Sequence, residues 1–393
     1  YVRIRSGSQA YAVGMGAYSV NTLMPWQNAN NSKMFAVSNG SIYDVTNTGT
    51  VGSAMVSGLS SNAYFNYVQF QGLGGSYLVG VNGVNVPQLF DGTGWNRTFS
   101  IVGGTHTTTT IDGLSSTTGL LAGQYITGAG IPAGTTITAV GPGAQITISN
   151  AATATASGVA LTVYQSPLIT GTSPITGTTP VFSNVNIFKN RLYFVETNSL
   201  NIWYLNVQSI GGAATIFPMQ GIFRQGGYIV AIGDWVVQNS TGIFEGFAVI
   251  TSEGEIAMYS GSYPGDTAWT ITGLYKTSRP LGSRCFAKAG GDLMIMTEDG
   301  IVSLSQVQQL DQIALQNVAI TQPIMPAWRN AVQSRTGLTG WQLTLWPSQS
   351  MGVVNLPKAS SLDKTQYIVN ARTGAWSSYV GWDANCFAVY NGN

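Results

Sequence analysis

Three glutamates are the side chains whose type and spacing come closest to supporting a reaction. Glu253 and Glu255 flank Gly254, and Glu298 stands next to Asp299 in a second, similar turn. A glycosidase needs two carboxyl groups beside a sugar linkage, one as acid and the other as base or nucleophile. Acidic residues at a hairpin tip more often accept hydrogen bonds from nearby backbone amides. Because these glutamates recur at one point of a repeated unit, a structural role is favoured over a polysaccharide depolymerase.

Other reactive side chains are few. His106 is the single histidine and lies in a Thr-rich loop that is poor in carboxylates, so we expect a solvated loop residue and not a catalytic base. Cys285 and Cys386 form no CxxC pair, and one disulfide or two buried free thiols both fit the sequence. No phosphate loop and no zinc or calcium ligand pattern occurs. We therefore predict that the chain is not an enzyme, with no catalytic, cofactor-binding or metal-binding residues and no cofactor.

The elements that would have to position any such residue are β-hairpins. An apolar run of strand length, a polar turn containing Gly and a second alternating run make one unit, which predicts a hairpin. Units of this kind turn at Gly40, Gly83, Gly254 and Gly300. The first two glycines are 43 residues apart and the last two are 46 residues apart. A four-stranded propeller blade repeats at about 40–45 residues, so this spacing favours a propeller.

A second regularity supports the repeat. Trp95, Trp269 and Trp376 each follow a Gly-containing turn. Further hairpins are predicted at residues 191–205 and 365–382. A large aromatic residue at one place in each repeat can fill the wedge between neighbouring sheets. We predict an all-β fold, a β-propeller of about six or seven blades. An array of β-sandwiches is the main alternative.

The composition changes sharply at Thr98, and from there to residue 188 the only charged side chain is Asp112. We predict a discontinuous propeller domain from residues 1–97 and 181–393. Residues 98–180 would form an inserted, small β-sandwich-like domain and the linker that follows it. Disorder is the competing interpretation of so polar a stretch, but the regular spacing of Ile and Val argues against it. The expected core of the insertion is Ile111, Leu114, Leu120, Ile126, Ile131, Ile137, Ile146, Ile148, Leu161 and Val163.

One segment of the propeller domain, residues 305–335, is compatible with helix. We predict a short helix near residues 321–334, with Thr321 as its N-cap and Pro323 in its first turn. Packing on its own domain is favoured over partner binding. Four apolar residues would share the face that packs: Ile324, Ala327, Trp328 and Ala331.

The charge content of the 393-residue chain is low. Charged residues make up 8% of the sequence and the net charge is +1, against roughly 25% charged residues in an average protein. No basic stripe is present to hold phosphates, so tight nucleic-acid binding is not expected. The sequence contains no apolar window of about 18 residues, so it predicts no membrane span. A nearly neutral, charge-poor surface fits close packing of copies in a permanent assembly.

Several segments resemble one family of viral structural proteins. The stretch FKNRLYFVETNSLNIWYLNVQSIGGAATIFPM begins at Phe188. FAVITSEGEIAMYSG, RPLGSRCFAKAGGDLMIMTEDGIVSLS and GAWSSYVGWDANCFAVYNG follow in order. Together they are similar to the nozzle, or tail tubular protein B, of short-tailed bacteriophages, and the similarity covers the N-terminal hairpins and nearly everything after Phe182. GIPAGTTI, from Gly130 to Ile137, resembles β modules that decorate phage structural proteins.

The resemblance implies a propeller-based virion protein at the distal end of a phage tail. Such subunits form a ring of six that continues and gates the DNA-ejection channel below the tail adaptor protein, with tail fibres or spikes attached nearby. DNA would pass without sequence-specific binding, and contact with the host envelope is compatible with this position. Scarce positive charge suits such a conduit, because each Lys or Arg contact with phosphate would slow the passage of DNA. The resemblance carries over no catalytic residue and assigns neither the gate nor the subunit interface.

Two other functions remain open from the sequence. A propeller that recognises glycans or a host receptor through exposed Trp and Tyr is the first alternative. A tail polysaccharide depolymerase that uses Glu253, Glu255 or Glu298 is the second and is the less favoured one.

Overall fold

Antiparallel strands dominate the computed structural model, which describes residues 9–62, 64–72, 75–164, 169–170, 180–239, 242–358 and 365–391. Outside the insertion, six antiparallel sheets of three or four strands form, and apart from the pair of β18 (Asn201–Tyr204) with β20 (Thr215–Pro218) each pairs strands that follow one another in sequence. Short apolar runs broken by Gly-containing turns produce this pattern, because each run can pair only with the run that the turn brings beside it.

The six sheets are called blades 1 to 6 in chain order. Blade 1 contains β2 (Val20–Gln27), β3 (Ser32–Ser38) and β4 (Ser41–Asp44), and blade 2 contains β6 (Asn66–Gly72), β7 (Gly75–Val81) and β8 (Gln88–Phe90). Blade 3 contains β16 (Phe182–Phe188), β17 (Arg191–Glu196), β18 (Asn201–Tyr204) and β20 (Thr215–Pro218). Blade 4 contains β21 (Ile229–Asn239), β22 (Gly242–Thr251), β23 (Glu255–Ser260) and β24 (Thr270–Lys276). Blade 5 contains β25 (Phe286–Ala289), β26 (Asp292–Thr297) and β27 (Gly300–Ser303). Blade 6 contains β28 (Gln342–Trp346), β29 (Met351–Asn355), β30 (Thr365–Asn370) and β31 (Trp376–Val380).

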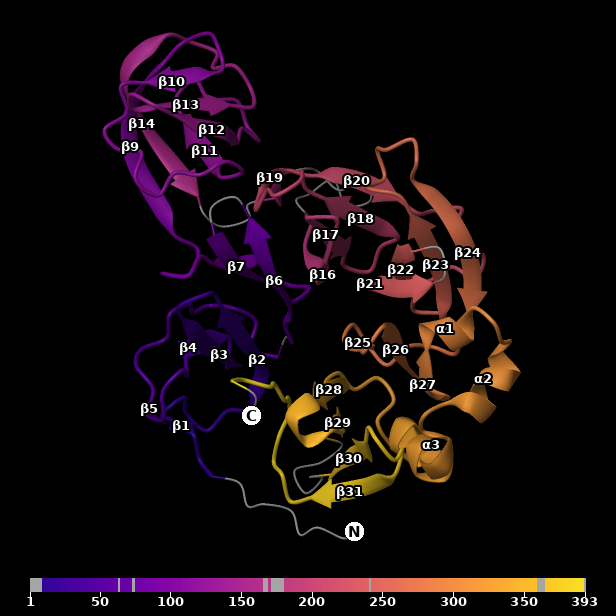
Figure 1. Cartoon of the computed structure of the whole chain (residues 1–393). Coiled ribbons are helices and arrows are strands. Elements are labelled where there is room, and N and C mark those ends of the chain that lie inside the picture. Colours follow the sequence, from indigo (N-terminus) through magenta and orange to yellow (C-terminus); the bar gives the residue numbers. More distant parts are fainter. Residues whose placement is uncertain are drawn as a thin grey trace.

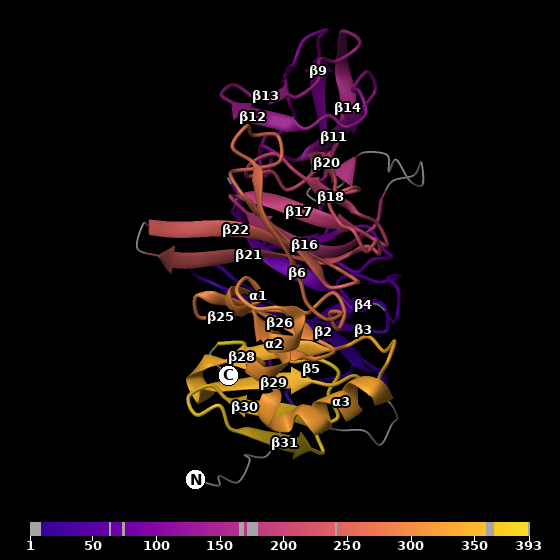
Figure 2. The same ribbon diagram turned by 90° about the vertical axis from the view of Figure 1, so that its right-hand side faces the viewer.

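The blades follow one another around a common centre, with the first strand of each blade innermost (Figure 1). Seen from the side, the β21–β22 hairpin extends beyond the other blades (Figure 2). Two short parallel pairs complete the described strands: β1 (Ala12–Val13) with β5 (Gly49–Thr50), and β15 (Ile169–Thr170) with β19 (Gly212–Ala213). The predicted β-propeller is confirmed, and it has six blades.

Aromatic side chains fill the wedges between blades, as the repeated tryptophans predict. Trp95, which follows blade 2, lies with its ring centre 5.1 Å from that of Phe35 of blade 1. Trp269 stacks on Tyr259 of its own blade at 5.2 Å and meets Phe188 of blade 3 at 6.0 Å. Such contacts lock the angle between neighbouring sheets, because a flat ring fits one wedge geometry.

The ring closes through residues 385–390, here called the closing segment. On one side Gln342 of blade 6 donates to the Phe387 carbonyl at 3.0 Å and accepts from the Phe387 amide at 3.1 Å. On the other side the Tyr390 hydroxyl lies 3.0 Å from Ser32 Oγ of blade 1. The closing segment therefore joins the last blade to the first without a shared sheet.

The insertion is one six-stranded sheet with the order β11-β14-β9-β10-β13-β12. Its two edges meet, since the Ile126 amide donates to the Thr135 carbonyl at 3.0 Å and the Ile137 amide to Gln124 at 2.8 Å. The predicted sandwich-like domain is thus a single sheet rolled around one core rather than two separate facing sheets. The strands are β9 (Thr98–Thr105), β10 (Thr110–Asp112), β11 (Tyr125–Gly128), β12 (Ile137–Gly141), β13 (Gln145–Ile148) and β14 (Ala156–Tyr164).

Every residue of the predicted insertion core lies in that core. Ile131 is partly buried there and the other nine are buried, joined by Ile101 and Val159. The first strand of the insertion begins at Thr98, which pairs with Tyr164 where the sheet ends. Most of the linker predicted at residues 166–180 lies outside the described residues.

Residues 304–334 hold three α-helices where a single one is predicted: α1 (Leu304–Val307), α2 (Gln312–Val318) and α3 (Met325–Ser334), with a 3-10 turn at Gln322–Ile324. Trp328 and Ala331 of α3 are buried in the core shared by blades 4, 5 and 6, so the helix packs on its own domain. Thr321 holds the N-cap position of the 3-10 turn, but its side chain makes no capping hydrogen bond. Its hydroxyl instead accepts a hydrogen bond from the Ile301 amide at 3.1 Å, because β27 passes beside it. No helix in the described part of the chain is long and apolar enough to cross a membrane.

The turn glycines behave as predicted, with one difference in loop length. Gly40, Gly83, Gly254 and Gly300 all have positive φ. The loop after β7 is longer than a tight hairpin turn. The side chain of Asn82 accepts hydrogen bonds from the amides of the second and third residues after it, at 3.1 and 2.8 Å. These bonds hold the chain in an Asx turn before β8 begins.

Gly254 tests how tightly the turns are packed. Its φ is +81°, and a Cβ there would lie 2.5 Å from the Thr277 carbonyl oxygen. At Gly374 φ is +69° but a Cβ would meet nothing within 4 Å. We expect Gly374→Ala to cost about 1–2 kcal/mol of unfolding free energy from backbone strain alone. Gly254→Ala should cost about 1–3 kcal/mol more because of the clash. Urea unfolding of both variants measures the difference, and equal losses would contradict the close approach.

A truncation tests the closing segment. Ala388 and Tyr390 pack against Met34 and Ala36 of blade 1, and burial of one large apolar side chain is worth about 1.5–3 kcal/mol. We expect a chain that ends at Ala384 to lose at least about 3 kcal/mol of unfolding free energy relative to a chain that ends at Asn391. Urea titration followed by tryptophan fluorescence measures this loss. An unchanged urea midpoint would show that the ring does not depend on this segment.

Candidate functional site

A cavity of about 230 Å³ lies on the axis of the propeller, where the inner parts of five blades meet. A second cavity of about 340 Å³ shares Ser283 and Arg284 with it, and a third of about 660 Å³ shares Asp234 and Lys288. Together the three are called here the axial cavity. Blades 2 to 6 each contribute polar side chains to the central part, among them Asn66, Asn184, Asp234, Arg284 and Gln342.

Asparagine side chains connect the blades around this centre. Asn66 of blade 2 donates to the Ser183 carbonyl at 2.7 Å and to Ser283 Oγ at 2.8 Å. Asn184 of blade 3 donates to the Ser283 carbonyl at 2.9 Å and accepts from the Ile232 amide of blade 4 at 3.3 Å. The polar groups thus hold neighbouring inner strands in place, because each bond joins two different blades.

Most charged groups of the axial cavity are paired. Lys288 lies 2.5 Å from Asp234, and Lys189 forms an ion pair with Glu245. Arg284 differs. Its guanidinium carbon lies 4.7 Å from the centre of the Tyr64 ring, and its Nη2 is buried with no hydrogen-bond partner in the described part of the chain.

The groups beside Arg284 carry no compensating charge. Burial raises the pKa of Tyr67 to about 12 and the pKa of the Cys386 thiol to about 12, so both stay protonated at neutral pH. Desolvation by burial also raises the pKa of Tyr64. Burial in turn lowers the pKa of Arg284, but an arginine side chain keeps its charge at neutral pH. The axial cavity therefore holds one arginine charge that no carboxylate in the described residues neutralises.

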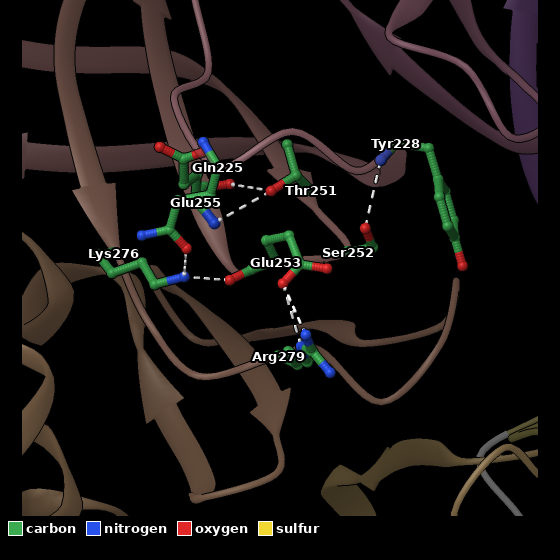
Figure 3. Close-up of polar contacts among 8 residues, drawn as sticks. All are labelled: Gln225, Tyr228, Thr251, Ser252, Glu253, Glu255, Lys276 and Arg279. Carbon is green, nitrogen blue, oxygen red and sulfur yellow. Dashed lines mark hydrogen bonds and ion pairs between the residues drawn. The ribbon is translucent and has the colours of Figure 1, made fainter.

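Two of the three glutamates with which the sequence hypothesis began, Glu253 and Glu255, lie elsewhere, at a turn of blade 4 (Figure 3). Glu255 is buried, and its carboxylate accepts hydrogen bonds from the amides of Arg224 at 3.1 Å and Gln225 at 2.8 Å. Its own amide donates to Thr251 Oγ1 at 3.1 Å. A buried carboxylate that accepts several amide hydrogen bonds anchors the backbone, in line with the structural role favoured for the turn acids.

The other turn acids also have local partners. Glu253 forms an ion pair with Arg279 at 2.9 Å, and its carbonyl accepts from Lys276 (Figure 3). Glu298 of blade 5 donates its amide to the Arg279 carbonyl at 2.9 Å and accepts from the Trp328 indole at 3.2 Å through its own carbonyl. The turns of blades 4 and 5 are therefore tied together through residue 279.

The remaining candidates are separate from both places. His106 Nε2 lies 3.0 Å from a carboxylate oxygen of Asp112, although it makes no hydrogen bond within the described residues. The cause of this proximity is the β9–β10 pairing, which brings Asp112 back beside residue 104. Cys285 and Cys386 are both buried free thiols, which settles the open choice between a disulfide and two thiols. In the described residues no group of three or more His, Cys, Asp or Glu side chains could hold a metal ion.

The sequence hypothesis did not include the residues of the axial cavity. Asn66 and Asn184 lie within the first three residues of a blade's first strand, and Arg284 lies two residues before one, so in the sequence they resemble ordinary residues near a turn. Arg284 offered one signal in the sequence, because it is a charged residue just before the short apolar run that begins β25.

Comparisons with known proteins give little further information. No protein-family model and no curated protein matches the chain. Among solved structures, Sqt1 of Saccharomyces cerevisiae has 11% identity and a TM-score of 0.43 over 95% of this chain and 89% of that one. The computationally designed Ika8 protein has 10% identity and a TM-score of 0.41 over 96% and 92%. YCF48 from Cyanidioschyzon merolae has 13% identity and a TM-score of 0.32 over 86% and 93%. The fold assignment therefore rests on the sheets of this chain and their circular order.

Two variants separate the roles of the turn acids. Glu255→Ala would leave two backbone amides without their acceptor, and each buried unsatisfied amide costs about 1–3 kcal/mol. We therefore expect a loss of about 2–4 kcal/mol of unfolding free energy. Glu253→Ala removes only a partly exposed ion pair and should cost less than about 1 kcal/mol. Chemical denaturation of both variants provides the measurement, and similar losses would show that Glu255 does not anchor this turn.

Proposed function

We propose that the chain is a structural virion protein of a short phage tail, a subunit of the ring-shaped nozzle at the distal end. In this role six copies surround the path of the DNA, below the tail adaptor protein and near the tail fibres or spikes. The ring continues and gates the ejection channel without reading the DNA sequence. The chain acts as a wall and not as a catalyst.

The segments that carry the family resemblance support this proposal. The stretch from Phe188 to Met219 builds most of blade 3, and the later stretches build parts of blades 4, 5 and 6 and the closing segment. The resemblance therefore involves the frame of the propeller and not a single loop. The insertion is a separate β module, which agrees with its own resemblance to decorating modules of phage structural proteins.

The observation that carries the proposal is an apolar, uncovered rim. β24 and β31 are the outer edge strands of blades 4 and 6 and lie on the periphery of the propeller (Figure 1). Ile271 and Leu274 on β24 are 43% and 37% exposed, and Val380 on β31 is 65% exposed. An open edge strand with apolar side chains favours pairing with another chain, and soluble monomers usually protect such edges. A second copy is the favoured partner, because a chain with net charge +1 does not repel its own copies.

The glycan-binding alternative has weaker support. Sugar rings stack on exposed aromatic faces, yet no Trp is among the exposed large side chains of the described residues. The exposed aromatic side chains there are Tyr11, Tyr18 and Tyr228. Tyr228 is far from Tyr11 and Tyr18 in the sequence, and the ring subunit remains the better-supported function.

Light scattering after size-exclusion chromatography tests the ring. Six copies of this 41.5 kDa chain give a particle of about 250 kDa. We expect the double variant Ile271→Lys, Val380→Lys to give the monomer mass instead, because burying unpaired ammonium groups in an interface costs several kcal/mol.

The matched control is Val140→Lys on the insertion, where the side chain is 40% exposed. This variant should keep the ring mass, and circular dichroism should show that both variants stay folded. A wild-type chain that remains monomeric at high concentration would overturn the proposal. A ring that survives the double variant would exclude the β24 and β31 rim as its interface.

A further inference from the structure

The axial cavity contains a positive charge with no described partner. Arg284 Nη2 is buried and unbonded, and the guanidinium stacks over Tyr64. A buried charge without a counter-charge costs several kcal/mol of folding free energy. The destabilisation seen when one partner of a buried ion pair is removed has the same cause. The stacked ring offsets only part of this cost, since a cation–π contact is worth about 0.5–2 kcal/mol.

The surroundings of Arg284 favour an anion over any other occupant. The 340 Å³ cavity beside it is lined by hydroxyl, amide and apolar side chains, and Arg284 is the only charged residue among those that line it. Across the central cavity, Asp234 is the only acidic residue in the lining, and it is already bound to Lys288. Tyr64, Tyr67 and Cys386 are the other titratable groups close to the guanidinium, and all three are neutral when protonated.

Hydrogen-bond donors are available beside the guanidinium. Ser283 Oγ accepts a hydrogen bond from Asn66, so its own hydroxyl proton is free to donate. Ser283 also lines both cavities that Arg284 lines. The space is ample, because about 10–15 Å³ of such volume already holds a water molecule. Arginine presents a planar fork that binds two oxygens of one oxyanion at once.

We propose that the axial cavity of the propeller binds a small oxyanion, of the size of acetate or inorganic phosphate, through the guanidinium of Arg284 and the hydroxyl of Ser283. The bound anion neutralises the charge of the Arg284 guanidinium and links blade 5 to the blades around it. A free oxyanion is favoured over an acidic side chain of a partner, because Arg284 lines both the central cavity and the 340 Å³ cavity and its Nη2 is buried. The site is independent of whether the chain forms a ring.

Thermal unfolding at constant ionic strength tests this site. Sodium chloride is replaced stepwise by sodium phosphate in one series and by sodium acetate in another. The wild-type unfolding temperature should rise and saturate in at least one series, by about 2 °C or more at ten times the dissociation constant. The series that saturates at the lower concentration distinguishes a phosphate-type from a carboxylate-type ligand.

Three variants assign the response to residue 284. Arg284→Met should weaken the apparent affinity by at least about tenfold, since a hydrogen bond to a charged group is worth about 1.5–3 kcal/mol. It should also unfold at the same or a higher temperature than the wild type in chloride alone, because the uncompensated charge is gone. Arg284→Lys keeps the charge and should retain a weaker, saturable response even if the Met variant folds poorly. Arg279→Met, at the exposed turn of blade 4, should respond like the wild type.

Two results would overturn the proposal. One is the absence of a saturable response to either anion in the wild type. The other is an equal response in the wild type and in Arg284→Met.

Discussion

The inner strand of each blade has a neighbour on one side only, and the structure depends on how its other edge is satisfied. That edge faces the axis, where six strands converge and no further strand can fit. Amides and carbonyls left unpaired in such a place would each cost free energy comparable to a lost hydrogen bond. Asn66 and Asn184 supply the missing partners from neighbouring blades, bonding to the backbone of Ser183, Ser283 and Ile232. An amide side chain suits this task because it both donates and accepts.

This requirement divides the propeller into a polar centre and an aromatic wall. Near the axis, short polar side chains such as Asn66 and Asn184 span the gap between inner strands. Farther out the blades diverge, and the space between them is filled by rings such as Trp95 and Trp269. The two zones also explain the composition, in which aromatic residues make up 11% and charged residues only 8% of the chain. Few charges are needed, because hydrogen bonds position the centre and ring packing positions the wall.

The parts of this architecture that depend on local sequence could be predicted. Hairpin turns, wedge tryptophans and the core of the insertion all follow from patterns within a few residues or from a fixed repeat. The axial contacts could not be predicted in this way, since Asn66 and Ser283 are 217 residues apart and nothing in either neighbourhood indicates the other. Thr321 shows the same limit at short range. Its sequence context suits a helix cap, but β27 offers its hydroxyl a buried amide, and the tertiary contact prevails over the local one.

The paired ends of the insertion have a consequence for how such chains diversify. Thr98 and Tyr164 are opposite each other on adjacent strands, so their Cα atoms are about 5 Å apart. A cassette whose ends are that close can be gained, lost or exchanged by recombination without disturbing the circular order of the blades. Related chains could therefore share one propeller and present unrelated modules at this position, each suited to a different environment.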